Sequence, residues 1–360
     1  MTSPEVRVRA IKIAATERLI KKYNINIILF MEINLNWTKE NSSANLSSWF
    51  QEDREVRSVL SQDHVAFGKH QPGSTGILVQ HEFLQYAKKP LVASGDERGL
   101  GRWCSWPFFN NPNHSTRIVV AYRPCLAKVK ELKAVYYQQQ KSYMQRENIQ
   151  GTPFEMFDRD LSDQIKKWRS AGERVILLMD INGDPLRNNV YKSIKAGSDG
   201  MEEFTHKCWG SEPPRTHARG SAPIDGGYIS PELEILNLCM LNVVDSPGDH
   251  RSLLLDVSTR SMLGEFLNTI CRPVSRRLVI SCKRLEEEGG KESREHQSKK
   301  KRMMFGLTPR LVVLLVLSAA TAVVTAAPHR INEFVVSVAA SSLLMIFGAL
   351  RKGIFFTQHK

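Results

Sequence analysis

The sequence lacks the cysteine patterns that mark a zinc ribbon or a disulfide framework. Its six cysteines include no Cys-x-x-Cys pair and show no regular spacing, whereas those folds require such pairs or spacings. The first twenty residues also lack a continuous apolar run, so a secretory signal peptide is not indicated. These absences favour reduced thiols in a protein that faces the cytosol.

Acidic residues are in the minority, with 37 Asp and Glu against 50 Lys and Arg, which gives a net charge of +13. A basic balance suggests a polyanionic partner such as nucleic acid or an anionic membrane. The excess is uneven, because residues 1–257 carry only +3, residues 258–310 carry +7 and residues 311–360 carry +3. The basic composition therefore does not identify the first part as a nucleic-acid binder.

Residues 1–257 have the pattern of a mixed α/β domain, in which short β-branched runs alternate with longer amphipathic runs. The clearest helix has one apolar stripe with spacings of three and four residues and ends near Gly172. That stripe consists of Phe154, Phe157, Leu161, Ile165 and Trp168. The predicted strands are 25–30, 75–79, 117–122, 175–179, 224–229 and 253–257.

The C-terminal part differs in composition from the first domain. Residues 258–310 lose the periodicity and are basic, which predicts a partly disordered linker. Two uncharged runs of 17 residues follow, 311–327 and 334–350, at the short end of the spanning range of about 17–25 residues. Basic residues flank the pair, so the positive-inside rule places both ends and the tail 351–360 in the cytosol. We predict a transmembrane helical hairpin over 311–350, with a pair of buried helices as the alternative.

Acidic and amide side chains stand at the ends of several predicted strands. They are Glu32, Asp180, Asn182, Asp225 and Asp249, and His250 follows the last of them. Each one alone is equally typical of a helix cap or a turn. Carboxylates from different strands that converge with a histidine, however, form a hard-oxygen metal site beside a general base. Their fixed order at strand ends favours this second interpretation.

The order resembles that of the endonuclease/exonuclease/phosphatase superfamily, the fold of deoxyribonuclease I, from about Ala10 to Val257. Tyr122 in Ala-Tyr-Arg-Pro matches the family's Tyr-x-Pro. The similarity is greater to the endonuclease domains of LINE-type retrotransposons, through residues 32–37, 101–103, 137–139 and 216–221. The resemblance implies a four-layer α/β/β/α sandwich, here followed by the two apolar helices.

The resemblance also implies roles for single residues. Glu32 and Asp249 would bind Mg²⁺ or Mn²⁺, and Asp180 would orient or deprotonate the attacking water. Asn182 would hold the water or the phosphate, Tyr122 would donate to the phosphate, and Asp225 would accept from His250 and fix its tautomer. Arg102 and Arg123, next to matched motifs, are candidate phosphate contacts.

Two family features are missing from the sequence. Family members begin with a strand that ends in an asparagine, but no asparagine precedes Asn24. Either the first strand is absent or Val6–Arg9 takes its place without the amide. In retroelements a connector leads to a reverse transcriptase, and here the connector-like residues 266–284 lead to the apolar runs instead, with no reverse transcriptase domain.

The sequence therefore predicts a divalent-metal-dependent phosphodiester hydrolase, a retroelement-derived endonuclease with DNA as its substrate. One alternative is a membrane-tethered phosphodiesterase of the sphingomyelinase or lipid-phosphatase type, and another is an inactive fragment. A membrane hairpin would place the protein on a membrane with its catalytic domain in the cytosol; otherwise we expect a nuclear or cytoplasmic location. The sequence leaves the target site, the oligomeric state and the competence of the chain open.

Overall fold

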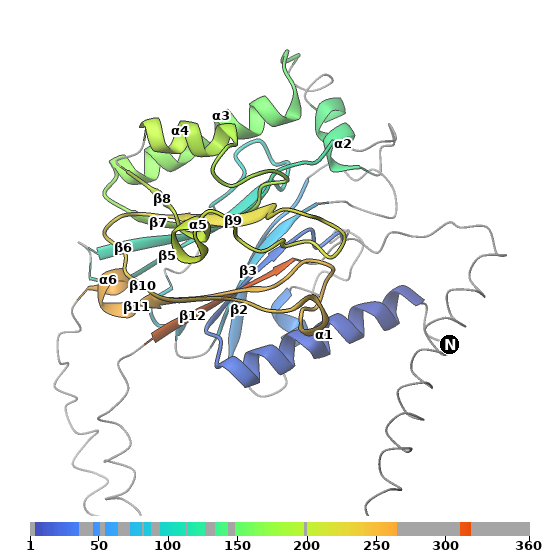
Figure 1. The fold of residues 1–360 in the computed structure, drawn as a ribbon, viewed down its shortest axis with the longest axis vertical. Helices are drawn as coiled ribbons and strands as arrows, with labels where there is room; N and C mark the ends of the chain where they lie inside the picture. The colour runs from blue at the N-terminus through green and yellow to red at the C-terminus, as the bar shows by residue number, and fades with distance from the viewer. Residues whose placement is uncertain are drawn as a thin grey trace, which may run out of the picture. The chain divides into compact units, whose positions relative to one another are not determined.

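Two six-stranded sheets form the framework of the chain (Figure 1). The computed structural model describes residues 4–35, 46–50, 55–63, 73–80, 83–87, 94–111, 114–126, 134–142, 148–197, 200–264 and 310–317. The first sheet has the order β10 (Ile235–Met240), β11 (Leu253–Ser258), β12 (Arg310–Leu317), β1 (Ile27–Met31), β3 (Thr75–Gln80) and β2 (Val56–Ser61). The second has the order β4 (Ser94–Gly95), β5 (Trp103–Asn111), β6 (His114–Tyr122), β7 (Arg174–Asp180), β9 (Asp225–Ile229) and β8 (Glu202–Glu203).

The central strands are apolar on both faces, and alternate side chains enter different cores. In β1, Ile27 and Leu29 belong to the core between the two sheets, whereas Ile28 belongs to the core on the outer face of the first sheet. In β6, Ile118 lies in the core between the sheets, whereas Val119 lies in the core on the outer face of the second. This alternation follows from the two-residue period of a strand. Both sheets are therefore covered on both faces.

Helices cover the two outer faces (Figure 1). On the first sheet, α1 (Pro4–Tyr23) packs Leu19 and Ile20 into the same core as Ile28. On the second sheet lie α3 (Pro153–Ser170) and α4 (Asn189–Gly197). The remaining helices are α2 (Val135–Ser142), α5 (Phe204–Trp209), α6 (Thr259–Leu263) and the 3-10 turns η1 (Leu46–Phe50) and η4 (Val243–Asp245). The layers run helix, sheet, sheet, helix, as the sequence predicted.

The start of α3 shows how local sequence sets an element. The hydroxyl of Thr152 accepts from the Glu155 amide while the Glu155 carboxylate accepts from the Thr152 amide, a reciprocal capping box. Pro153 occupies the first turn, where its missing N–H costs nothing. The predicted apolar stripe then buries Phe157, Leu161 and Ile165 against the sheet.

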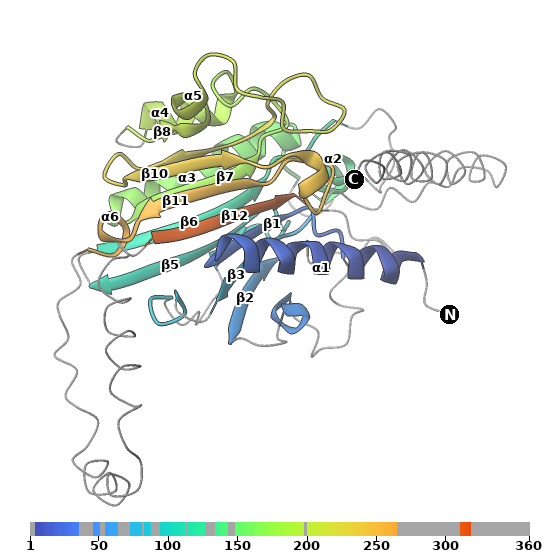
Figure 2. The same cartoon turned by 60° about the horizontal axis from the view of Figure 1, so that its bottom comes forward.

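Among the described residues no strand precedes β1, because residues 4–23 form α1. The place beside β1 is filled by β12, which runs parallel to β1 and antiparallel to β11 (Figure 2). Val6–Arg9, the other sequence-based alternative, lies within α1 and forms no strand. The run Arg310–Leu317 is rich in leucine and valine, a composition that suits a central strand as well as a membrane helix.

The structure therefore also differs from the predicted helix over residues 311–317, which are strand. The rest of the predicted helix 311–327, the whole of 334–350 and the tail 351–360 lie outside the described residues. Among the residues that are described, no helix has the length and apolarity needed to cross a membrane. Of the predicted linker, residues 258–264 continue the domain through the end of β11 and α6, because Met262 and Leu263 join the core between the sheets.

Candidate active site

Three of the predicted residues lie side by side at one edge of the second sheet. Asp180 is the last residue of β7. It is paired on one side with Tyr122, the last residue of β6, and on the other side with Asp225, the first residue of β9. The Arg123 amide donates to the Asp180 carbonyl at 2.9 Å, which extends the ladder past Tyr122. All three side chains are buried. The backbone pairing thus fixes their spacing.

Asn182 follows directly in a turn that needs a left-handed residue. Its φ is 50°, a conformation that asparagine adopts more readily than most residues. Its backbone amide donates to Asp180 Oδ1 at 3.0 Å, and its side-chain Nδ2 donates to the Arg123 carbonyl at 2.7 Å. Asn182 therefore orients the Asp180 carboxylate from one side.

His250 is held by Asp225. The distance between His250 Nδ1 and Asp225 Oδ2 is 2.8 Å, and because a carboxylate only accepts, the proton sits on Nδ1. Thr216 Oγ1 accepts the amides of Ile224 and Asp225 at 2.9 and 3.2 Å, which anchors the start of β9. Burial opposes a charge on the imidazole, but the hydrogen bond and the charge of Asp225 dominate and raise the pKa of His250 to about 9.

Glu32, which directly follows β1, is a contribution of the first sheet to this site. It follows β1 with a φ of 48°, a costly conformation for a residue of this type. Its side chain is hydrogen-bonded to Tyr122, at the end of a strand in the other sheet. Burial is the main cause that raises the pKa of Glu32, and Asp249 and Asp225 add to it. Beneath it, the Asp180 amide contacts Met31 Sδ at 3.0 Å, so the two sheets meet here.

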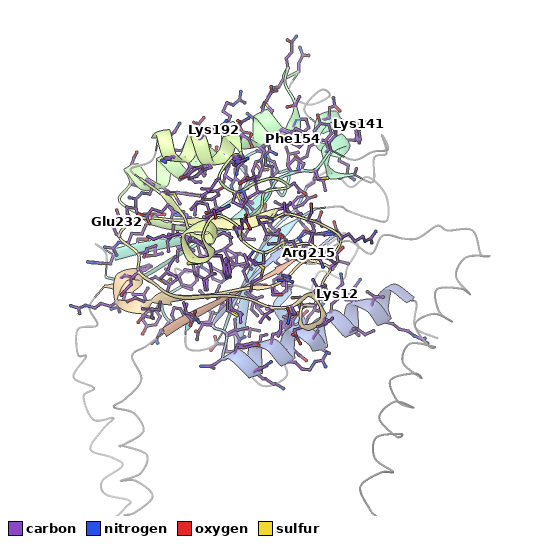
Figure 3. The ribbon with its side chains drawn as sticks, in the orientation of Figure 1. Lys12, Lys141, Phe154, Lys192, Arg215 and Glu232 are labelled. Atoms are coloured by element: carbon purple, nitrogen blue, oxygen red, sulfur yellow. The ribbon has the colours of Figure 1, made fainter. Side chains whose placement is uncertain are left out.

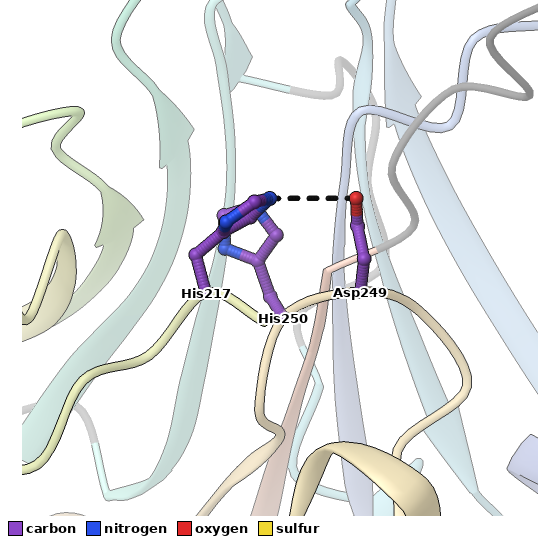
Figure 4. A group of neighbouring side chains, drawn as sticks. All are labelled: His217, Asp249 and His250. Carbon is purple, nitrogen blue, oxygen red and sulfur yellow. Dashed lines mark ion pairs between the residues drawn. The ribbon is translucent and has the colours of Figure 1, made fainter. Parts of the chain in front are cut away.

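Asp249 and His217 lie on the other side of His250 (Figure 4). His217 Nε2 is 3.5 Å from Asp249 Oδ2, and the imidazole rings of His217 and His250 meet edge to face at 4.7 Å. Backbone bonds tie the two loops together, from Arg251 N to Thr216 O at 2.7 Å and from Ala218 N to Asp249 O at 2.8 Å.

Lys12 lies on α1 (Figure 3) and is within electrostatic range of Asp249 and Glu32. Burial is the main cause that lowers the pKa of Lys12, while Asp249 and Glu32 act in the opposite direction by attraction. The lysine is half-buried. It brings a cation within electrostatic range of two carboxylates.

The group of carboxylates fits a divalent cation. Burial, followed by repulsion from Asp225, raises the pKa of Asp180 well above its ordinary value. Within the described part of the chain, Asp225 Oδ1 and Asp249 Oδ1 are buried without a hydrogen-bond partner. Candidate ligand atoms lie within 4.8 Å of one another in two overlapping groups, His217 with Asp249 and His250, and Asp180 with Asp225 and His250. Hard oxygen donors of this kind suit Mg²⁺ or Mn²⁺.

The structure brings seven of the nine predicted residues together: Glu32, Tyr122, Asp180, Asn182, Asp225, Asp249 and His250. Arg102 and Arg123 differ from the prediction. The Arg102 guanidinium is buried and binds Asp96 at 2.6 and 2.7 Å and Asp160 at 2.9 Å. Arg123 forms a two-pronged ion pair with Asp158 at 2.7 and 3.0 Å.

These pairs correct the prediction of phosphate contacts, because both guanidinium groups are occupied by carboxylates of the protein itself. The motif Gly101-Arg102-Trp103 is architectural. A Cβ on Gly101 would come within 2.6 Å of the Gln62 backbone. Gly101 also has a positive φ, which residues with a side chain rarely adopt. Trp103 is buried and packs edge to face on Phe157 at 6.2 Å.

His217 and Lys12 had no predicted role. His217 lay within the matched segment 216–221, so the motif pointed at the loop without singling out the imidazole. Lys12 carries no such signal, because it is one of several basic residues on α1. Only the packing of α1 brings it near Glu32 and Asp249.

No family model and no curated protein matches the chain. Among solved structures, it is similar to the catalytic domain of human Nocturnin with bound sulfate, with 16% identity, a TM-score of 0.47, and coverage of 69% of this chain and 85% of that one.

It is also similar to the 3′ phosphatase NExo from Neisseria bound to a product DNA hairpin, with 11% identity, a TM-score of 0.46, and coverage of 67% and 91%. A third match is an endonuclease/exonuclease/phosphatase family protein from Leptotrichia buccalis, with 15% identity, a TM-score of 0.40, and coverage of 69% and 92%. At such values these structures say nothing of this chain's substrate, which has to come from its own residues.

Replacing Arg102 with methionine is expected to lower the free energy of unfolding by about 3–5 kcal/mol, because the buried carboxylate of Asp96 loses its ion-pair partner. Burial raises the pKa of Asp160, but Arg98 and Arg102 outweigh it and hold that pKa below its usual range. Urea unfolding followed by tryptophan fluorescence measures the change. The control Arg187→Met alters a side chain that is 87% exposed, and is expected to change stability by about 0.5 kcal/mol or less. Unchanged stability in Arg102→Met would contradict the structural role.

The Asp225–His250 pair predicts an imidazole that stays protonated at neutral pH. In the full chain with EDTA, NMR titration is expected to show a His250 pKa of about 9, and a value near the ordinary 6.5 in Asp225→Asn. A pKa raised in the folded state stabilises the fold at pH below about 6.5, and this stabilisation is lost as the pH rises through about 9. Asp245→Asn, an exposed carboxylate in η4, serves as the control. A wild-type value near 6.5 would refute the pairing.

Proposed function

We propose that this chain is a divalent-metal-dependent phosphodiester hydrolase that acts on DNA. The observation that carries the proposal is the buried Asp225–His250 pair at 2.8 Å, set between Asp180 and Asp249. A phosphodiester is an anion and a poor electrophile, so hydrolysis needs positive charge at the phosphate and an activated water in line with the leaving oxygen. The site contains groups for both tasks.

Glu32 and Asp249 are the residues that would hold the metal. Bound there, Mg²⁺ or Mn²⁺ would polarise a phosphate oxygen and offset the repulsion among the carboxylates. Glu32 is suited to this because its backbone conformation and its bond to Tyr122 fix the carboxylate. Asp249 is suited because one of its oxygens, Oδ1, is left without a partner in the described structure.

His250 supplies positive charge. Its Nδ1 proton is directed at Asp225, which leaves Nε2–H of the imidazolium to donate to a phosphate oxygen. The hydrogen bond to Asp225 raises the pKa of His250, which favours the protonated imidazole as a donor to the phosphate. Tyr122, whose pKa burial and Glu32 raise well above its ordinary value, stays a neutral donor.

Asp180 is then the residue that takes the proton of the attacking water. Burial and Asp225 raise its pKa, which brings the carboxylate closer to the range where a base works at neutral pH. Asn182 orients it through the amide bond to Oδ1. The water oxygen bonds to phosphorus, its proton passes to Asp180, and the bond from phosphorus to the leaving oxygen breaks, with the leaving oxygen protonated from solvent.

The proposal of DNA as the substrate, and of a retroelement origin, rests on the sequence motifs of the LINE-type subgroup. The matched segment 216–221 contains Thr216 and His217, which touch the site directly. The matched Gly101–Trp103 instead supports the fold. The membrane-tethered alternative loses support at its first predicted span, since residues 311–317 are strand.

Purified full-length protein is expected to nick supercoiled DNA in the presence of Mg²⁺ or Mn²⁺ and to stop on addition of EDTA. Asp180→Asn and His250→Gln should each lower the rate by about 10²–10⁴, the usual contribution of a positioned acid or base. The control is Asp163→Asn, an exposed carboxylate on α3, which should nick like the wild type. Agarose gels separate the supercoiled, nicked and linear forms.

Equal nicking by the wild type and both variants would identify a contaminating nuclease. No nicking by the wild type at any concentration of either metal would contradict the activity and support the inactive-fragment interpretation. Parallel reactions with RNA and with sphingomyelin vesicles test the substrate class, and hydrolysis of the vesicles alone would overturn the assignment of DNA.

A further inference from the structure

The strand β12 lies between the two strands of the first sheet that lead into the site. Glu32 follows the last residue of β1, and Asp249 and His250 come shortly before β11. In the sheet order, β12 separates β11 from β1 (Figure 2). The predicted metal ligands of this sheet therefore flank a strand that comes from a distant part of the chain.

The register ties both neighbours to the same residues of β12. Val313 lies opposite Ile27 in β1 and opposite Leu255 in β11. Leu315 lies opposite Leu29 and Leu253 in the same way. Neighbouring strands are spaced about 4.7–4.9 Å apart, so an empty position would leave a gap of about 10 Å between β1 and β11. Unpaired backbone groups would line both sides of that gap, which a sheet interior does not tolerate.

We infer that Arg310–Leu317 is a positioning segment for the proposed reaction, whose backbone pairing sets the separation of Glu32 from Asp249 and His250. The segment acts through the strands and contributes no group to the chemistry. It also has a second possible environment, because its residues begin the apolar run 311–327 that is long enough for a short membrane span. A strand paired on both sides cannot lie in a bilayer, so seating in the sheet and membrane insertion exclude each other.

Hydrogen exchange on the full chain, without detergent or lipid, tests whether β12 is paired between β1 and β11. Amides of 311–316 are expected to exchange as slowly as those of β1 and β11, since each is bonded to one neighbour or the other. The edge strand β10, paired on one side only among the described strands, provides the internal comparison. Exchange of 311–316 at the rate of an unstructured peptide would overturn the inference.

A disulfide cross-link between β11 and β12 tests the register directly. Leu254→Cys with Leu314→Cys joins residues that lie opposite each other, within the Cα separation that a disulfide spans. Leu254→Cys with Leu311→Cys, three positions out of register, is the matched control. Mass spectrometry of the oxidised full chain should find the first cross-link and little of the second. Equal yields, or neither cross-link, would contradict the arrangement.

Val313→Pro tests the link to function, because proline removes a backbone donor from a strand that is paired on both sides. We expect loss of exchange protection in β1 and β11, retained protection in α3, and nicking reduced by at least tenfold. Val313→Ile, which keeps the amide, should match the wild type. Full activity in Val313→Pro would overturn the positioning role.

This inference rests on the proposed function only for the nicking assay. If the wild-type chain does not cleave DNA, the proposed function fails, and the exchange and cross-linking results still decide whether β12 is seated. If the chain cleaves DNA but 311–316 exchange freely, the inference fails and the function stands.

Discussion

The hydrogen bond between Asp225 and His250 is the interaction on which the rest of the site depends. It places a buried carboxylate against an imidazole at 2.8 Å, and this hydrogen bond together with the charge of Asp225 raises the pKa of His250 although burial opposes the charge. Asp225 lies on β9, which pairs with β7 so that Asp225 is opposite Asp180. This bond therefore links His250 to Asp225 and, through the pairing of β7 with β9, to Asp180.

The site is assembled from both sheets, and this makes its geometry a property of the whole sandwich. Tyr122, Asp180 and Asp225 are fixed by neighbouring ladders of the second sheet, whereas Glu32, Asp249 and His250 adjoin strands of the first. The contacts between Tyr122 and Glu32 and between His250 and Asp225 join the two sets. Repulsion among the carboxylates is then held in check by the packing of the sheets, which is a suitable setting for a cation.

Local signals in the sequence predicted the central strands and α3, whereas the layers and the roles of the site residues followed from the family resemblance. Continuous apolar runs marked the central strands, and spacings of three and four residues marked α3. The edge strand β10 has a mixed pattern of exposed and half-buried residues, which no simple period describes. Such a strand is defined by its partner and could not be predicted from its own residues.

Two errors had a common cause, namely that a residue's partner lies far away in the sequence. Arg102 resembles a loop arginine until α3 brings Asp160 to it. Residues 311–317 resemble the start of a membrane helix until β1 and β11 leave a place between them. In both cases composition was compatible with two environments, and only tertiary structure selects one.

We propose that Glu32 and Asp249 hold a divalent cation, and metal binding tests this without reference to turnover. Titration of the full-length, EDTA-stripped protein with Mn²⁺, followed by isothermal calorimetry or by the electron paramagnetic resonance of the free ion, is the direct measurement. We predict saturable binding that weakens at least tenfold in Glu32→Gln and in Asp249→Asn and is unchanged in Asp163→Asn. Equal Mn²⁺ affinity in the wild type and both site variants would contradict the account.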